Sequence, residues 1–93
     1  MPLTELRRSP LVEQAIQRLR EQITSGAWPI GARLPSEATL AAELGVGRST
    51  IREAIRALAS TGMVESRQGA GTFVRAAAAP EVGLETQIGR AHV

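Results

Sequence analysis

The stretch Gly45-Val-Gly-Arg-Ser-Thr-Ile-Arg-Glu-Ala-Ile-Arg-Ala-Leu58 predicts a short turn followed by a helix with two unlike faces. At about 100° per residue, its apolar positions share one side of that helix. These positions are Ile51, Ala54, Ile55 and Leu58. Arginine recurs every fourth residue on another side, at Arg48, Arg52 and Arg56. Such a helix can bury one face in a small core and lay the other in the major groove of DNA.

The same pattern also fits an ordinary surface helix, because arginine-rich solvated faces are common on amphipathic helices. Ser49 and Thr50 add hydroxyl groups beside the first arginine, which suits contact with phosphates and base edges. The helix alone does not distinguish a solvated face from a DNA-binding one, so the neighbouring segments must decide.

The composition indicates one small domain with tails, because the chain has 93 residues. Hydrophobic residues make up 43% and aromatic residues 2%, so we expect a modest aliphatic core with Trp28 and Phe73 as anchors in the core or a loop. The chain has no cysteine, which excludes a disulfide framework or a thiolate site. This fits a reducing compartment, and we expect a cytoplasmic protein. We expect no membrane segment, since no apolar run is long enough to span a bilayer.

Positive charge is concentrated in the second half of the chain, although the net charge is only +2. Residues 1–47 hold five arginines and five glutamates, whereas residues 48–75 hold five arginines and two glutamates, a local net charge of +3. All eleven basic residues are arginine. Arginine bonds guanine and phosphate with two parallel hydrogen bonds, but an arginine-only composition can also reflect the codon bias of a GC-rich genome.

The sequence contains few of the residue types that enzymes use for catalysis. The sequence has no aspartate, tyrosine or cysteine, and its one histidine is His92, next to the end. It shows neither a nucleophile–base pair nor a glycine loop that would hold phosphate before a helix. We therefore expect no catalytic residue, no cofactor and no metal site.

Helix signals divide the first half of the chain. Residues 1–8 form an expected flexible arm, and Ser9-Pro10 predicts a capped helix start. An apolar stripe then predicts a packing helix that runs to about Ser25, with Gly26 as the stop. The stripe comprises Val12, Ile16, Leu19 and Ile23.

A loop follows, in which Trp28 and Ile30 are expected to fold back onto the core and Arg33-Leu34 to form a very short strand. Ser36 predicts the cap of a second helix that ends at Gly45. Its separation from the third helix, a short glycine-containing turn, matches a helix-turn-helix, a spacing that is weakly specific alone.

Residues 63–67 and 72–75 predict two short strands joined at Gln68-Gly-Ala-Gly71. The expected fold class is therefore mainly α with a small β-hairpin, a winged helix-turn-helix of three helices plus a wing. The glycine-rich tip has few side chains to obstruct approach to a minor groove, although turn geometry alone also accounts for its glycines.

Three motifs in this order resemble the DNA-binding domain of the GntR family of bacterial transcription regulators, with the FadR-like subgroup most similar. They are Arg33-Leu-Pro-Ser-Glu37, the stretch Leu44–Leu58, and Gly69-Ala-Gly-Thr-Phe-Val74. The resemblance covers residues 9–75, and the three motifs together are highly specific. It implies sequence-specific DNA binding by a metabolite-responsive regulator, with repression the expected outcome.

The resemblance also implies the DNA-binding residues. The first turn of the third helix would contact base edges and phosphates through Arg48, Ser49, Thr50 and Arg52. Gly69 at the wing tip, beside Gln68, would enter the minor groove, and Arg33 and Ser36 would hold the DNA backbone. For Arg56 two possibilities stay open, an ion pair with Glu53 or a solvated side chain.

Two positions depart from the family pattern. Ala38 stands where Leu-Pro-Ser-Glu-Arg-Glu-Leu has arginine, so one base contact is lost or moved and the operator sequence cannot be carried over. Gly47 replaces the usual serine cap of the third helix, and glycine caps only slightly less well, so we expect fraying rather than loss of the helix.

Composition changes after Arg75. Residues 76–86 are expected to be a linker, and residues 87–93 resemble the translation of a sequencing adapter, so we expect a C-terminal truncation with a non-native tail. In the family, a C-terminal domain binds a small-molecule effector and dimerises. The implied partners of the intact protein are therefore double-stranded DNA with an imperfect inverted repeat, a second copy of the chain and that effector.

Two alternatives stay open. Some GntR relatives join this domain to an aminotransferase-like domain that uses pyridoxal phosphate, although the short linker argues against such a fusion. A winged helix can also serve protein–protein contact alone, but that function would not need Arg48, Arg52 and Arg56 unpaired on one face.

Overall fold

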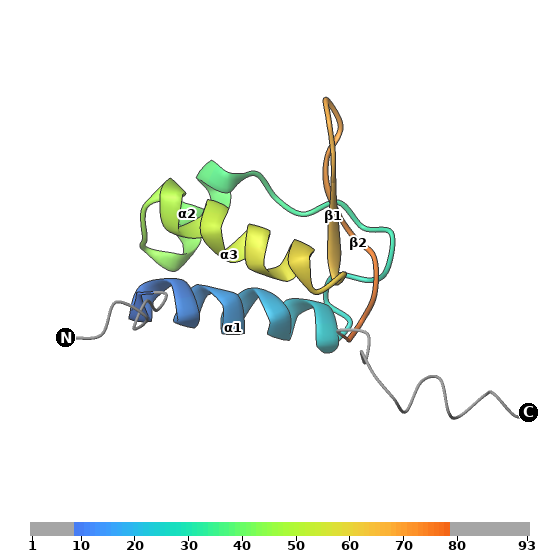
Figure 1. Ribbon diagram of the computed structural model, residues 1–93, viewed down its shortest axis with the longest axis horizontal. Coiled ribbons are helices and arrows are strands. Elements are labelled where there is room, and N and C mark those ends of the chain that lie inside the picture. The colour runs from blue at the N-terminus through green and yellow to red at the C-terminus, as the bar shows by residue number, and fades with distance from the viewer. Residues whose placement is uncertain (1–8, 79–93) are drawn as a thin grey trace, which may run out of the picture.

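The computed structural model describes residues 9–78, which form three helices and an antiparallel hairpin. The elements are α1 (Pro10–Thr24), α2 (Glu37–Leu44), α3 (Arg48–Ser60), β1 (Val64–Arg67) and β2 (Gly71–Val74). Figure 1 shows α1 running beside α3, with the hairpin projecting away from α1 at the end of α3. This arrangement confirms the predicted winged helix-turn-helix. The expected arm, the end of the linker and the tail lie outside the described residues.

The helix boundaries follow the capping residues. Ser9 Oγ accepts a hydrogen bond from the Val12 N–H at 3.2 Å, and Ser36 Oγ accepts one from the Thr39 N–H at 3.1 Å. Gly45 ends α2 in the left-handed conformation, with φ of 70°. This conformation is unfavourable for residues with a Cβ, and glycine has none. Each of these boundaries is the predicted one.

The core is a single aliphatic cluster between the helices and the base of the hairpin, and α3 lies at its centre. Three residues of α3 are 0% exposed, namely Ile51, Ala54 and Leu58. The opposing stripe of α1 is buried as predicted, together with Leu40 and Ala41 of α2. α3 is therefore held rigidly from one side, which leaves its other face available.

The hairpin is anchored at its base by a third extended segment. Val64 pairs with Val74 and Arg67 with Gly71 across the two strands. Residues 31–34 add backbone hydrogen bonds on the other edge, from the Leu34 N–H to the Thr72 carbonyl and from the Val74 N–H to the Ala32 carbonyl, both at 2.8 Å. The predicted very short strand at Arg33-Leu34 is thus an isolated bridge between Arg33 and Phe73.

The loop before α2 differs in part from its prediction. Trp28 packs partly buried against the core, as expected, but Ile30 is 66% exposed. The reason is a turn in which the Ala32 N–H donates to the Pro29 carbonyl at 2.9 Å, because this places Ile30 at the outer corner. The expectation that Ile30 returns to the core is therefore wrong.

No helix within residues 9–78 combines the length and apolar character needed to cross a membrane.

Candidate nucleic-acid interface

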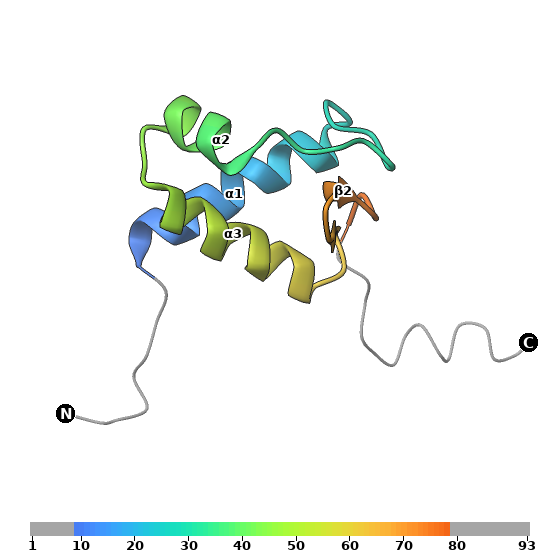
Figure 2. The same cartoon turned by 90° about the horizontal axis from the view of Figure 1, so that it is seen from above.

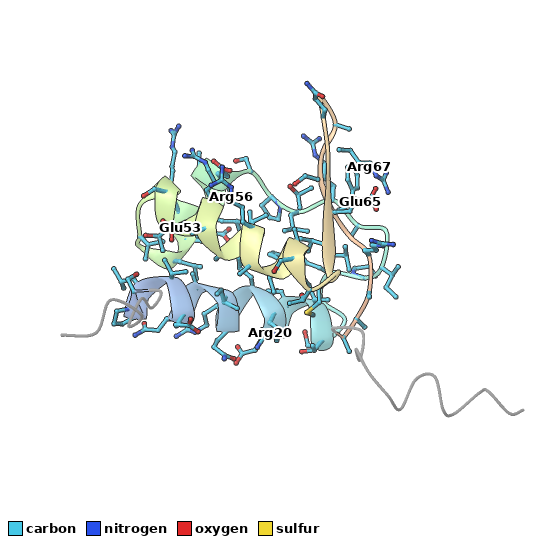
Figure 3. All side chains as sticks on the ribbon, in the orientation of Figure 1. Arg20, Glu53, Arg56, Glu65 and Arg67 are labelled. Atoms are coloured by element: carbon cyan, nitrogen blue, oxygen red, sulfur yellow. The ribbon has the colours of Figure 1, made fainter. Side chains whose placement is uncertain are left out.

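The two faces of α3 separate as the sequence predicts. Its apolar residues are buried, whereas Arg48, Arg52 and Arg56 are exposed. Figure 3 shows Arg56 on the side of α3 that is turned away from α1 and towards which the hairpin projects. Figure 2 looks onto this side, with α2 and α3 next to the hairpin. One side of the molecule therefore combines an arginine-bearing helix and a protruding wing.

The start of α3 is open to an acceptor. Arg48 is its first residue, and Ser49 beside it is also exposed, whereas Thr50 is half-buried. Gly47 supplies no side-chain cap, so the N–H groups of the first turn keep their capacity to donate. Those donors and the positive end of the helix dipole favour a phosphate oxygen at this point.

The arginines of α3 differ in their partners. Within residues 9–78, no side chain pairs with Arg48 or Arg56, so the structure favours the solvated possibility for Arg56. Arg52 instead makes an ion pair with Glu37 at the start of α2, with Nη2 3.1 Å from Oε1. The expectation of three unpaired arginines is therefore wrong for Arg52, because α2 packs against α3 and brings a carboxylate within its reach.

The start of α2 places Ser36 beside this ion pair. Besides capping α2, the Ser36 hydroxyl donates to Thr39 Oγ1 at 3.0 Å. The hydrogen of the Ser36 hydroxyl is therefore already donated to a side chain of α2. A contact between this turn and a DNA backbone would come from main-chain N–H groups at the helix start.

The wing tip is shaped by its glycine. Gln68 and Gly69 are both exposed, and the Ala70 N–H closes the turn onto the Arg67 carbonyl at 2.9 Å. Gly69 has φ of +79°, and no atom beyond its two chain neighbours lies within 4 Å of the position its Cβ would occupy. The backbone conformation, rather than crowding inside the protein, therefore requires glycine here, and the space beside it is open to a ligand.

The outer face of the wing carries two further arginines, Arg67 and Arg33. The Arg67 guanidinium lies 4.3 Å from the centroid of the Phe73 ring, and its Nε donates to Glu65 Oε2 at 3.3 Å. Arg33 lies across Gly71, where an ideal Cβ would approach Arg33 Nε to 2.6 Å. Arg33, predicted to hold the DNA backbone, thus belongs to the wing and shares its outer face with Arg67.

The predicted site residues accordingly form three groups on α3, at the start of α2 and on the wing. Sequence reasoning missed Glu37, Arg67 and Phe73. The pairing of Arg67 with Phe73 follows once the strand register is known, because Glu65 lies opposite Phe73 on the same face. Within residues 9–78, no cluster of three or more His, Cys, Asp or Glu residues could hold a metal ion.

Comparison with known proteins extends these observations. Residues 11–74 match the family model described as bacterial regulatory proteins, gntR family. Over 66 residues, the chain is 47% identical to a histidine utilization repressor of Pseudomonas aeruginosa and 46% identical to the mannosyl-D-glycerate transport/metabolism system repressor MngR of Escherichia coli. These matches cover 71% of this chain but 26% and 28% of the two relatives. The chain thus spans about a quarter of the length of the curated relatives that it matches.

Solved structures share the fold. A GntR protein of Streptococcus agalactiae superposes with a TM-score of 0.68 at 43% identity, over 88% of this chain and 38% of that chain. The DNA-binding domain of AraR in complex with operator ORR3 gives a TM-score of 0.68 at 36% identity, over 80% of this chain and 89% of that chain. The second of these structures contains the operator.

Proposed function

Because this chain belongs to the GntR family of bacterial regulatory proteins, we propose that its winged helix binds duplex DNA sequence-specifically as part of a transcription regulator. The observation that carries the proposal is the exposed arginine face of α3, whose Arg56 lies on the side of the molecule towards which the hairpin projects (Figure 3). An α-helix fits the major groove, and a glycine tip can approach the minor groove closely.

The residues take different roles in this proposal. Arg48, Ser49 and Thr50 lie in the first turn of α3, from which base edges and phosphates can be contacted, and Arg52 follows one turn later. Gln68 and Gly69 contact the minor groove. Arg33 and the start of α2 at Ser36 contact the DNA backbone.

The whole regulator is a further part of the proposal. The two repressors named above suggest repression, and their greater length leaves room for an effector-binding and dimerisation domain. A dimer would place two copies of α3 on an imperfect inverted repeat, with the spacing set by its two-fold symmetry. A small-molecule effector would act through the second domain, and the protein would act in the cytoplasm, where bacterial DNA lies. Membership of the FadR-like subgroup stays a prediction, since the family match spans the winged helix alone.

The test is selection of duplexes from a random pool by the 93-residue chain, followed by fluorescence anisotropy across a salt series. We expect one half-site to be enriched and bound more tightly than a scrambled duplex at every salt concentration. Affinity for both duplexes should fall with salt, because arginines displace counterions from phosphates. Enrichment of no sequence, with binding that tracks salt alone, would contradict base recognition by this domain.

A further inference from the structure

We propose that Glu37 is a positioning residue for Arg52. By orienting this arginine, Glu37 raises discrimination between DNA sequences and lowers the general affinity for DNA. The inference rests on the proposed function and deepens it. It assigns a role in specificity to an acidic residue outside the set of expected DNA contacts.

The contact between the two side chains fixes the plane of the guanidinium. Arg52 Nη2 donates to Glu37 Oε1 at 3.1 Å, and Arg52 Nε donates to Glu37 Oε2 at 3.4 Å. Both carboxylate oxygens thus face one edge of the rigid guanidinium fork. The other N–H donors of Arg52 stay open, and their direction is set before DNA arrives. A donor that is already oriented loses less conformational freedom on binding.

Glu37 can take this role because α2 has another cap. Ser36 Oγ already accepts the Thr39 N–H, so the carboxylate of Glu37 is not needed to satisfy that donor. Glu37 reaches instead to a residue 15 positions later in the chain, across the interface between α2 and α3. The contact therefore links the first helix of the helix-turn-helix to the DNA-facing side of the second.

Arg52 is the arginine of α3 that is held in this way, since Arg48 and Arg56 have no side-chain partner within residues 9–78. The two free arginines can follow any nearby phosphate, which attracts DNA of every sequence. Arg52 has one preferred orientation, so it increases affinity for a DNA sequence that presents a hydrogen-bond acceptor in that direction. We therefore assign general attraction to Arg48 and Arg56, and part of the discrimination to Arg52.

Stability of the fold does not account for this ion pair. The side chains of Arg52 and Glu37 are 47% and 39% exposed, and exposed ion pairs contribute little to folding. A carboxylate on the DNA-facing side also repels phosphates of any sequence. This repulsion lowers affinity for every DNA sequence. Specificity then arises because the oriented arginine restores affinity only for the sequence that it recognises.

The experiment compares binding of the full chain and its variants to the selected duplex and to a scrambled duplex by fluorescence anisotropy. The variants are Glu37→Ala, Glu37→Gln, Arg52→Ala and the double variant Glu37→Ala/Arg52→Ala. Glu53→Gln is the matched control, because Glu53 is an exposed carboxylate on α3 next to Arg52 and has no side-chain partner within residues 9–78. Circular dichroism and thermal melting check that each variant folds.

For Glu37→Ala we expect affinity for the scrambled duplex to rise by up to about fivefold, the effect of removing one exposed charge. The ratio of affinities for the selected and scrambled duplexes should fall roughly tenfold, within the range that one bidentate base contact supplies. Glu37→Gln keeps one acceptor and should give an intermediate ratio. Glu53→Gln should tighten both complexes and leave the ratio unchanged. Once Arg52 is alanine, Glu37→Ala should no longer change the ratio.

An unchanged ratio in Glu37→Ala, with a wild-type chain that discriminates, would overturn the positioning role and leave the proposed function intact. An equal fall of the ratio with and without Arg52 would overturn it as well, because Glu37 would then act independently. If the alanine variant does not fold, the ratio of Glu37→Gln decides in the same way. A wild-type chain without any sequence preference would overturn the proposed function, and this inference with it.

Discussion

Two of the regions that carry arginines, α3 and the hairpin, hold them by different means. α3 is fixed by four buried apolar residues, and its Arg48 and Arg56 extend without side-chain partners among residues 9–78. The hairpin is buried only near its base, and its Arg67 lies against Phe73 and Glu65, while Arg33 lies across Gly71. The core-held helix α3 leaves two of its arginines free and orients Arg52 through Glu37, whereas the exposed hairpin orients its arginine through contacts within the wing.

Leu58→Ala should have the largest effect, because it removes the support of α3. Leu58 is 0% exposed, and truncation of such a leucine costs about 2–5 kcal/mol of unfolding free energy. Urea denaturation measures this loss, with Leu11→Ala as the control, since Leu11 is 52% exposed and should change stability by less than about 0.5 kcal/mol. Equal effects of the two substitutions would mean that α3 is not the centre of the core.

Gly71→Ala should disturb the hairpin next most strongly. Gly71 has φ of +116°, which strains any residue with a Cβ, so we expect the free energy of unfolding to fall by roughly 2–3 kcal/mol. The new Cβ would also displace the flexible end of the Arg33 side chain. Gly69→Ala is the matched control, because Gly69 also has a positive φ, +79°, but no non-neighbouring atom lies within 4 Å of its Cβ position. This substitution should lower the free energy of unfolding by about 1 kcal/mol. Denaturation of both variants in an Arg33→Ala background checks the cause. The gap between them should narrow there, and an unchanged gap would show that Arg33 does not restrict this position.

Arg48→Ala should separate binding from folding on α3. Arg48 has no side-chain partner within residues 9–78, so its loss should leave thermal stability unchanged. Affinity for the selected and the scrambled duplex should fall by a similar factor, because the unpartnered Arg48 is assigned to phosphate attraction. Anisotropy on both duplexes measures this, and a loss confined to the selected duplex, worth about 1–3 kcal/mol, would assign Arg48 to a base edge instead. Arg18→Ala on α1 is the control and should bind both duplexes almost as the wild-type chain does.

Phe73→Leu should give the smallest effect and tests the local support of Arg67. Leucine keeps an apolar side chain but removes the ring face beneath the Arg67 guanidinium. We therefore expect the free energy of unfolding to fall by about 0.5–1 kcal/mol. A double-mutant cycle with Arg67→Ala in denaturant measures the coupling directly. A coupling energy near zero would mean that Arg67 on the hairpin is as free as Arg48 on α3.

Local signals in the sequence predicted most of the fold. Ser9, Ser36 and Gly45 mark helix boundaries because capping depends on residues a few positions apart, and the apolar periodicity of α3 identifies its buried face. The error in the loop before α2 arose because a turn, and not the hydrophobicity of the residue, decides which side chain is exposed. Ile30 was expected inside, but the turn from Pro29 to Ala32 turns it outwards.

The candidate site was predicted less completely, because its contacts join segments that are distant in the sequence. The pairing of Arg52 with Glu37 depends on how α2 packs on α3, which no periodicity within either helix specifies. The contact of Arg67 with Phe73 depends on strand register, and the place of Arg33 on the wing depends on the bridge between Arg33 and Phe73. The residue types were evident from the sequence, but their partners required the tertiary structure.

The most direct test of the DNA-binding face is a titration of the 15N-labelled chain with the selected duplex, followed by amide chemical shifts. We predict the largest shifts at the first turn of α3, from Arg48 to Arg52, and at Gly69 on the wing tip, with small shifts along the solvent face of α1. The largest shifts on α1, with α3 and the wing tip unchanged, would contradict the assignment of this face to DNA.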